Sequence, residues 1–337
     1  MWRYRSWLPV AGEAVTLGEG DTPLVRSRAF GPSVHLKDEG ANPTRSFKDR
    51  PVAVATAMAL ELEAAGLLCA STGNTAVSVA AYGAHVGLPV ECLVPDGTPR
   101  DKLEAIASAG ARLRPVAGTY SDAHAEASAL AARSGWANLT TTYVNPFMLE
   151  GDKTLGLELF EQLGGVPDAV VVPVGAGPLL AGIGKAFDEL RAAGLTSRGP
   201  RLYAVQAAGC APIARAFDEG APVRAWEQPR TVAGAIADPL AGYVADGDRT
   251  LAAVRASGGA AIAVDDDEMA RAARELAERD GIAVELSAAA AAAAFLRLRE
   301  DGRIATDDVT VLVLTAADRR AQALRSPSNT GRRKLRS

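Results

Sequence analysis

The chain has 337 residues, of which 48% are hydrophobic and 23% charged, and its formal net charge is −4. These values are typical of a globular protein large enough for two lobes, and the negative charge argues against nucleic acid as a partner. No apolar stretch approaches about 20 residues, so we expect no membrane partner and no secretion signal. The three cysteines are odd in number and separated in the sequence, as expected of reduced thiols in a cytoplasmic protein, and the three histidines lack metal-ligand spacing.

Short apolar runs alternate with helical patterns, which is typical of an α/β protein with mainly parallel sheets flanked by helices. We expect strands at 34–37, 67–70, 90–94, 112–116, 169–174, 202–206 and 309–315. We expect helices at 50–65, 76–86, 102–109, 121–134, 148–163, 179–193 and 267–279. A run of seven alanines, 288–294, predicts another helix that packs closely against a neighbour, with Ser287 as its cap.

No clear linker divides the chain. We therefore expect a small α/β domain at 52–142, inserted into a larger domain formed by 1–51 and 143–325, with a ligand in the cleft between the two lobes. Residues 326–337 are rich in Ser, Arg and Lys and predict a disordered tail.

The segment 42–50, Asn-Pro-Thr-Arg-Ser-Phe-Lys-Asp-Arg, places Lys48 immediately before the first predicted long helix. A helix N-terminus disfavours a positive charge, and partial desolvation produces the neutral amine that covalent chemistry requires. The chain has only six lysines beside thirty arginines, and arginine cannot lose its proton in this way. A solvated lysine in the first turn of a helix is the alternative.

A second segment, Ser71-Thr72-Gly73-Asn74-Thr75-Ala76, follows a short apolar strand and opens a helix of small residues. Backbone amides at such a turn attract an anion, and the three hydroxyl side chains add donors. Helix capping explains one such residue, but it does not explain four within five positions.

The third segment, 170–182, is a buried strand followed by a glycine turn and a helix, which is typical of a phosphate-binding cradle. A dinucleotide-binding site is the alternative. Gly175 and Gly177 fit its pattern, but Leu180 occupies the position of the third glycine. The next strand also ends without an acidic residue for a ribose, which argues against a nicotinamide cofactor.

Taken together in this order, the three segments resemble the fold-type II enzymes that use pyridoxal phosphate, and among them most closely the threonine synthase family. The resemblance covers almost the whole chain. It includes the segments 3–10, 19–24, 42–50, 71–76, 144–146, 149–154, 170–182, 206–209, 281–285, 287–289 and 311–315.

The resemblance implies a role for each matching residue. Lys48 forms the Schiff base with pyridoxal 5'-phosphate and moves the α-proton, while Asn74 contacts the ring hydroxyl. Thr315 faces the ring nitrogen, and Glu285 lies at the cofactor edge, although a first-turn acid that favours the helix is an equal alternative. The phosphate cradle comprises Gly175, Ala176, Gly177 and the amide of Leu179. The substrate carboxylate is held by Ser71, Thr72 and Thr75.

The chain also departs from the threonine synthase pattern. Arg45 stands where glycine is usual, Tyr143 where a small hydroxylic residue is usual, and Phe147-Met148 where a basic phosphate contact is usual. Ala316-Ala317-Asp318 replaces Gly-His-Gly, and the glycine turn is one residue shorter and lacks asparagine. Arg45 could supply a replacement cation for an acidic substrate; the alternative is a surface pair with Glu39 or Asp49.

The resemblance therefore implies an enzyme that eliminates a leaving group from an activated amino acid and adds a nucleophile back. The activated amino acid is expected to be phosphorylated or acidic. Threonine synthase itself, acting on O-phosphohomoserine, is one candidate, and the departures described above favour a different substrate. A β-replacement or β-elimination lyase, similar to cysteate synthase or a dehydratase, is one alternative. A non-catalytic regulatory protein that binds pyridoxal phosphate is another. A homodimer is expected.

Overall fold

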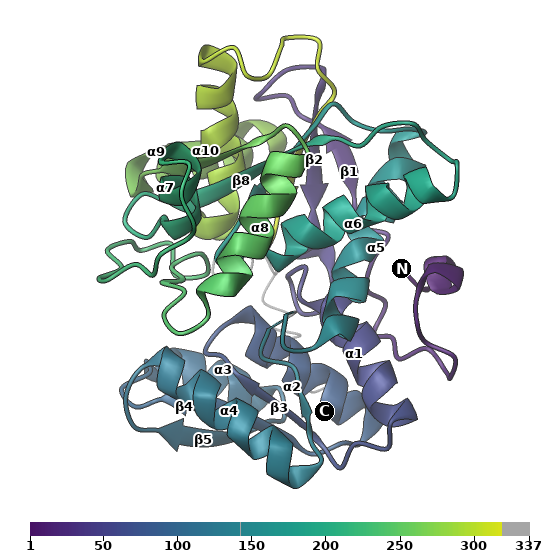
Figure 1. The fold of residues 1–337 in the computed structure, drawn as a ribbon, viewed down its shortest axis with the longest axis vertical. Helices are drawn as coiled ribbons and strands as arrows, with labels where there is room; N and C mark the ends of the chain where they lie inside the picture. The colour runs from purple at the N-terminus through teal and green to yellow at the C-terminus, as the bar shows by residue number, and fades with distance from the viewer. Residues whose placement is uncertain (142, 319–337) are drawn as a thin grey trace, which may run out of the picture.

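The computed structural model describes residues 1–141 and 143–318, which form two sheets with helices packed around them (Figure 1). The predicted tail, 326–337, lies outside the described residues. The α/β class and the mainly parallel sheets predicted from the sequence are confirmed. The domain boundaries at 52 and 142 stay a prediction.

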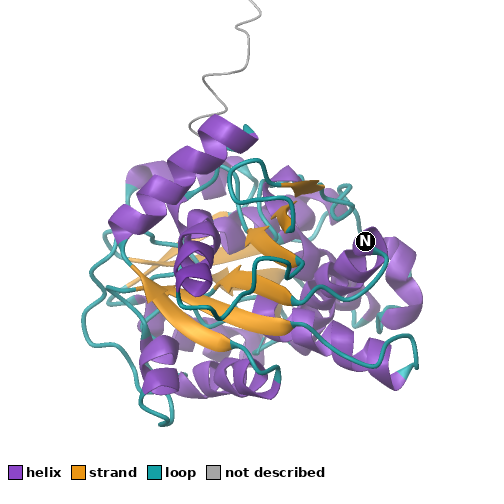
Figure 2. Ribbon diagram, turned by 90° about the horizontal axis from the view of Figure 1, so that it is seen from above, coloured by secondary structure: helices purple, strands orange, loops and turns teal. Residues whose placement is uncertain are grey.

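The larger sheet has six strands in the order β1-β2-β10-β7-β8-β9. Only β1 is antiparallel to its neighbour. The strands are β1 (Leu24–Arg26), β2 (Val34–Asp38), β7 (Ala169–Pro173), β8 (Arg201–Ala207), β9 (Ala260–Val264) and β10 (Thr310–Leu314). The surrounding helices are α5 (Pro146–Leu163), α6 (Pro178–Ala192), α7 (Pro212–Asp218), α8 (Val244–Ala256), α9 (Asp266–Glu275) and α10 (Leu286–Glu300). Figure 2 shows the strands enclosed by helices.

The smaller sheet has four parallel strands in the order β5-β4-β3-β6. These are β3 (Leu67–Ala70), β4 (Val90–Pro95), β5 (Arg112–Val116) and β6 (Ala137–Asn138). The helices near it in the lower part of Figure 1 are α1 (Asp49–Glu61), α2 (Asn74–Val86), α3 (Arg100–Ser108) and α4 (Tyr120–Ser134).

The strands of the larger sheet divide their side chains between two cores, as the alternation of a strand requires. Val171 packs with the alanine helix α10, whereas Val170 and Val172 pack with α5 and α6. The seven alanines are all buried, so the predicted close packing of this helix is confirmed. The predicted cap is wrong: α10 begins at Leu286 with Glu285 at the N-cap, and Ser287 lies in the first turn, where its Oγ accepts a hydrogen bond from the Ala235 amide.

The three cysteines are free and buried, but Cys69 and Cys92 are not apart in space. They face each other on paired strands β3 and β4, with their Sγ atoms 3.5 Å apart.

Candidate active site

Lys48 is the N-cap residue of α1, at the point where the chain enters the helix. Its side chain is half-buried, and Nζ lies 4.6 Å from the centroid of the Phe47 ring. Burial lowers the pKa of the Lys48 amine, while the carboxylates of Asp152 and Asp238 act in the opposite direction. The amine therefore loses its proton more readily than an exposed lysine, as the sequence predicts.

The segment that follows β10 contacts two other parts of the chain. One is the loop before α1 that carries Lys48 (the lysine loop, residues 42–48), and the other is the start of α10. The Phe47 amide donates a hydrogen bond to the Thr315 carbonyl at 3.0 Å, and the Ala317 amide donates to the Arg45 carbonyl at 3.0 Å. On the other side of the segment, the Glu285 amide donates to the Ala316 carbonyl at 3.1 Å. Backbone bonds thus bring together three regions that are far apart in sequence, and these regions carry Lys48, Thr315 and Glu285.

The lysine loop is also fixed to α2 through Asp49. Its carboxylate accepts hydrogen bonds from the amide and hydroxyl of Thr44 and from the hydroxyl of Ser78 on α2, at 2.6 to 2.7 Å. Asp49 is fully buried, so it holds the loop against α2 in one arrangement.

The hydroxyl-rich segment lies at the N-terminus of α2. The helix begins at Asn74, two residues earlier than predicted, with Gly73 at the N-cap and no capping side-chain hydrogen bond among the described residues. Ser71 Oγ accepts a hydrogen bond from the Gly73 amide at 3.2 Å, and Thr75 is buried. First-turn amides and hydroxyls can therefore meet a carboxylate here.

Asn74 and Glu285, predicted separately for the cofactor site, are in contact. Asn74 Nδ2 lies 3.3 Å from both carboxylate oxygens of Glu285. The contact connects α2 beside the small sheet with α10 beside the large sheet, so both residues lie where the two parts of the protein meet.

The glycine turn connects β7 to α6 and has little room for larger residues. Gly177 has φ +89° and is the N-cap of α6; a Cβ on it would lie 2.3 Å from Thr250 Cγ2. A Cβ on Gly175 would lie 3.1 Å from Asp238 Cβ. The described residues provide no side-chain cap for α6, so its N-terminus has the form of an anion site.

Two polar side chains hold the carbonyls of this turn. Thr250 Oγ1 donates to the Ala176 carbonyl at 2.5 Å, and Gln206 Nε2 donates to the Gly175 carbonyl at 3.0 Å. Fixing these carbonyls orients the peptide units of the turn.

The residues that replace the usual phosphate contacts have different surroundings. Met148 is fully buried in the core of the small sheet, and Phe147 packs against that core. Tyr143 instead lies beside the glycine turn, where its hydroxyl is 3.0 Å from Thr250 Oγ1. The guanidinium of Arg249 lies 5.2 Å from the centroid of the Tyr143 ring.

Asp152 and Asp238, the two carboxylates that act on Lys48, are not among the site residues that the sequence predicts. Asp152 is buried on α5, and Asp238 lies in the loop before α8. Asp152 lies in the segment 149–154, which matches the resemblance without marking this residue. No motif marks Asp238, because its loop has no periodic pattern from which a position could be inferred.

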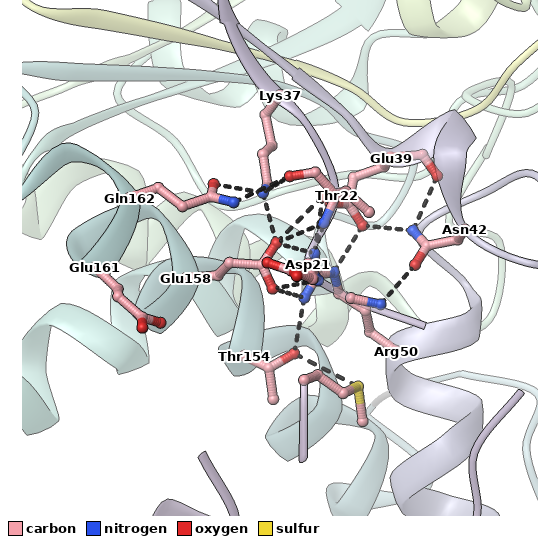
Figure 3. Close-up of polar contacts among 12 residues, drawn as sticks. Asp21, Thr22, Lys37, Glu39, Asn42, Arg50, Thr154, Glu158, Glu161 and Gln162 are labelled. Carbon is pink, nitrogen blue, oxygen red and sulfur yellow. Dashed lines mark hydrogen bonds and ion pairs between the residues drawn. The ribbon is translucent and has the colours of Figure 1, made fainter. Parts of the chain in front are cut away.

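A buried ion network includes Arg50, two residues after Lys48 (Figure 3). Arg50 forms two hydrogen bonds with Glu39, at 2.7 and 2.8 Å, and one with Glu158 Oε1 at 2.9 Å. Lys37 Nζ lies 2.5 Å from the same Glu158 oxygen. All four side chains are fully buried. The alternative, a surface pair of Arg45 with Glu39 or Asp49, is wrong, because both carboxylates are buried with other partners. Glu39 forms its ion pair with Arg50. Asp49 accepts hydrogen bonds from the hydroxyls of Thr44 and Ser78.

Within residues 1–141 and 143–318, no helix is long and apolar enough to cross a membrane. The same residues contain no cluster of side chains that could hold a metal ion.

The chain is similar to known proteins over almost its whole length. Residues 15–316 match the family model described as pyridoxal-phosphate dependent enzyme. A threonine synthase of Methanosarcina acetivorans is 38% identical over 325 residues, which cover 94% of this chain and 78% of that protein. A threonine synthase of Mycobacterium tuberculosis is 36% identical over 93% of this chain and 86% of its own length.

Solved structures show the same fold. The processed form of threonine deaminase isoform 2 from Solanum lycopersicum has a TM-score of 0.74 and 22% identity, covering 96% of this chain and 91% of that one. A fungal L-serine ammonia-lyase from Rhizomucor miehei has a TM-score of 0.75 and 21% identity, covering 91% and 95%. The chain therefore belongs to the family of pyridoxal-phosphate dependent enzymes, and it has the fold-type II architecture.

Proposed function

We propose that this enzyme eliminates a leaving group from an activated amino acid and adds a nucleophile back, on a substrate other than O-phosphohomoserine. The observation that carries the proposal is the joining of the Lys48, Thr315 and Glu285 regions by backbone hydrogen bonds. This arrangement supports a site with a desolvated lysine and a hydroxyl on the adjoining segment, beside the contact between Asn74 and Glu285.

The residues present fit pyridoxal phosphate. The uncapped N-terminus of α6 and the two glycines whose Cβ positions are crowded suit a phosphate held by the amides of Gly175, Ala176, Gly177 and Leu179. Lys48 is the attachment point, Asn74 the contact to the ring hydroxyl, Thr315 the partner of the ring nitrogen and Glu285 a contact at the ring edge. When bound, the cofactor supplies an electron sink for the negative charge that develops at the substrate α-carbon.

The protein's own groups provide the proton transfer and the substrate contacts. The lowered pKa of Lys48 increases the fraction of neutral amine, which can accept the α-proton. Ser71, Thr72 and Thr75 orient the substrate carboxylate at the start of α2. The Thr315 hydroxyl does not hold a proton on the ring nitrogen as an aspartate would, which favours elimination over transamination.

Two observations support a substrate that differs from O-phosphohomoserine. Met148 is in the hydrophobic core, so this part of α5 offers no cation to a phosphate, and Tyr143 occupies space beside the glycine turn. Arg45 stays a candidate contact for a phosphorylated or otherwise acidic side chain. The described residues give it no ion pair, and its charge acts on Asp38.

A β-elimination or β-replacement lyase is the second candidate, because Asp238 places a carboxylate near Lys48 where a phosphate group would be repelled. The solved deaminase and ammonia-lyase with this fold are consistent with such a reaction.

Substrate mixing tests the proposal. Purified protein with cofactor is incubated with O-phosphohomoserine, O-phosphoserine and serine, and the cofactor absorbance and the release of phosphate or keto acid are followed. We expect turnover of at least one substrate, with O-phosphohomoserine not the best. A Lys48→Ala variant serves as the inactive control. Full cofactor binding with no turnover of any activated amino acid would instead support the non-catalytic regulatory protein.

A further inference from the structure

Asp238 lies against the glycine turn and near the catalytic lysine. Its Cβ is 3.1 Å, and its Oδ2 3.5 Å, from the position of a Cβ on Gly175. The residue is partly exposed, and its charge acts on Lys48. The carboxylate thus lies against the glycine turn, and its charge acts on the Lys48 amine.

The loop that carries Asp238 fixes its orientation. The Leu240 amide donates to Oδ1 at 3.0 Å, and the Tyr243 hydroxyl donates to the same oxygen at 2.8 Å. The Tyr243 ring stacks on His124 of α4, with the centroids 4.9 Å apart and the planes at 10°. The described hydrogen bonds of this carboxylate all go to Oδ1, so Oδ2 can interact with a substrate.

We propose that Asp238 determines substrate choice by disfavouring a phosphate or sulfate leaving group and favouring an uncharged hydroxyl. This inference rests on the second candidate function, the β-elimination lyase, and specifies its substrate class: a hydroxy amino acid rather than one with a phosphorylated or acidic side chain. Two charges of the same sign in a partly desolvated site repel each other, and juxtaposed like charges are a common source of specificity. A hydroxyl can instead donate a hydrogen bond to Oδ2.

The experiment compares L-serine with L-serine O-sulfate, which share a carbon skeleton and differ by one negative charge. Sulfate is preferred to phosphate because a phosphate ester titrates near pH 6. The ratio of kcat/KM for the two compounds is measured for the wild-type holoenzyme and for Asp238→Asn. We expect the wild type to prefer serine and the variant to shift the ratio toward the sulfate by roughly 10- to 100-fold.

A binding measurement removes the dependence on turnover. Holoenzyme whose link to Lys48 has been reduced with borohydride is titrated calorimetrically with the same two compounds. Asp238→Asn is expected to tighten binding of serine O-sulfate and to leave serine unchanged or weaker. Asp188→Asn is the matched control: it makes the same charge change at an exposed position on α6, where Asp188 pairs only with Arg191 among the described residues.

The dependence on pH gives a test that needs no change at Asp238. Burial raises the pKa of Asp238, while the bonds from Leu240 and Tyr243 lower it. Because only the ionised carboxylate repels the sulfate, the preference for serine over serine O-sulfate is complete above that pKa and is lost as the pH falls through it. Tyr243→Phe removes one of these bonds, so it should move the loss of this preference to higher pH.

The other titratable groups near Asp238 are Lys48, Tyr120, His124, Cys210 and Asp246. Any pH dependence that persists in Asp238→Asn belongs to them.

The outcomes separate this inference from the proposed function. Absence of elimination with every substrate contradicts the proposed function. Elimination with a serine-to-sulfate ratio that is equal in the wild type, Asp238→Asn and Asp188→Asn overturns the role of Asp238 alone. If Asp238→Asn does not fold, a wild-type preference for serine O-sulfate, or a preference for serine that is independent of pH in both wild type and Tyr243→Phe, overturns it as well.

Discussion

Lys48 is surrounded by groups that act on its charge in opposite directions. Burial favours the neutral amine, whereas Asp152 and Asp238 favour the ammonium form. Such a balance places the amine where it can both bind covalently and exchange a proton. Lys37 and Lys153, by contrast, are buried in ion pairs with glutamates, which leaves them unsuited to covalent chemistry.

This contrast predicts which lysine carries the cofactor. The protein with pyridoxal phosphate should absorb at roughly 410–420 nm, and borohydride reduction followed by peptide mapping should place the label on Lys48. Lys37 and Lys153 are internal controls within the same digest. A label on either of them, or none after reconstitution, would contradict the assignment.

Thr315 predicts the type of reaction. Thr315→Asp should favour a proton on the ring nitrogen, change the cofactor spectrum and reduce elimination relative to transamination. Thr315→Ser keeps the hydroxyl and should retain the wild-type spectrum. A folded Thr315→Asp protein with unchanged spectrum and turnover would show that this side chain is remote from the ring.

Replacing Arg45 with glycine should increase the stability of the protein and change its specificity. It has φ +74°, a conformation that costs a non-glycine residue about 1–2 kcal/mol, partly offset by the higher chain entropy of glycine. Arg45→Gly should therefore raise the free energy of unfolding by up to about 1 kcal/mol, measured by urea denaturation.

The kinetics of the same variant test Arg45 as a substrate contact. Arg45→Gly should lower kcat/KM for acidic substrates by about 10²-fold or more and leave serine unaffected. Arg45→Asn, which tolerates the same backbone conformation, controls for the change in backbone. Equal kinetics for acidic substrates in all three proteins would exclude Arg45 from the substrate site.

At the scale of elements, the junction of β7 with α6 depends on the absence of a side chain. Gly177→Ala would push a methyl group into Thr250, and we expect the dissociation constant of pyridoxal phosphate to rise by about tenfold or more. Gly194→Ala is the control, because Gly194 also has a positive φ, +73°, but its Cβ position has no neighbour within 4 Å. Equal cofactor affinity in the two variants would show that the clash with Thr250 does not weaken cofactor binding.

Sequence periodicity predicted most elements near the site, because buried strands and helices with apolar faces have strong patterns. It missed β1, β6, β9, α7 and α8. β6 has two residues and α7 has seven, too few for a periodic signal. The predicted extension of α1 to residue 65 is also wrong: the helix ends at Glu61, and Glu63 has φ +53°, a conformation that only tertiary contacts can stabilise.

The site could be predicted in part for the same reason. Lys48 and the glycine turn lie at junctions between elements, where local sequence indicates a helix N-terminus. Asp238 and the partners of Arg50 depend on contacts between distant segments. Glu158 and Lys37 lie within a regular helix and strand, where charged side chains are normally expected to be solvated.

At the scale of the whole molecule, the buried ion network connects β2, α1 and α5. Burial alone would raise the pKa of Glu158, but Arg50 and Lys37 outweigh it and hold this pKa well below its usual range. A carboxylate with a lowered pKa contributes stability above its unfolded pKa, and this contribution is lost as the pH falls through the folded value. The native protein should therefore lose stability in acid.

Removing Arg50 should reverse the way in which the ion network makes stability depend on pH. Arg50→Met leaves two buried carboxylates without their main partner, which should cost about 3–5 kcal/mol at pH 7. The cost should shrink as the pH falls, because Glu39 and Glu158 then take up protons. Urea denaturation between pH 4 and 8 measures it, with Arg100→Met as the control, since the Arg100 side chain is 92% exposed and should give no measurable change. A cost at pH 7 no larger than that of the Arg100→Met control would refute this role for the network.

The position of β10 in the fold has a consequence for the order in which the protein matures. This strand lies between β2 and β7 and ends at the segment that joins Lys48 to Glu285. A nascent chain leaves the ribosome from its N-terminus, so Lys48 and the glycine turn emerge long before the strand that brings the site together. Stable capture of the vitamin-derived cofactor is therefore a late step in biosynthesis. The colour of the bound cofactor reports that β10 has been inserted into the sheet.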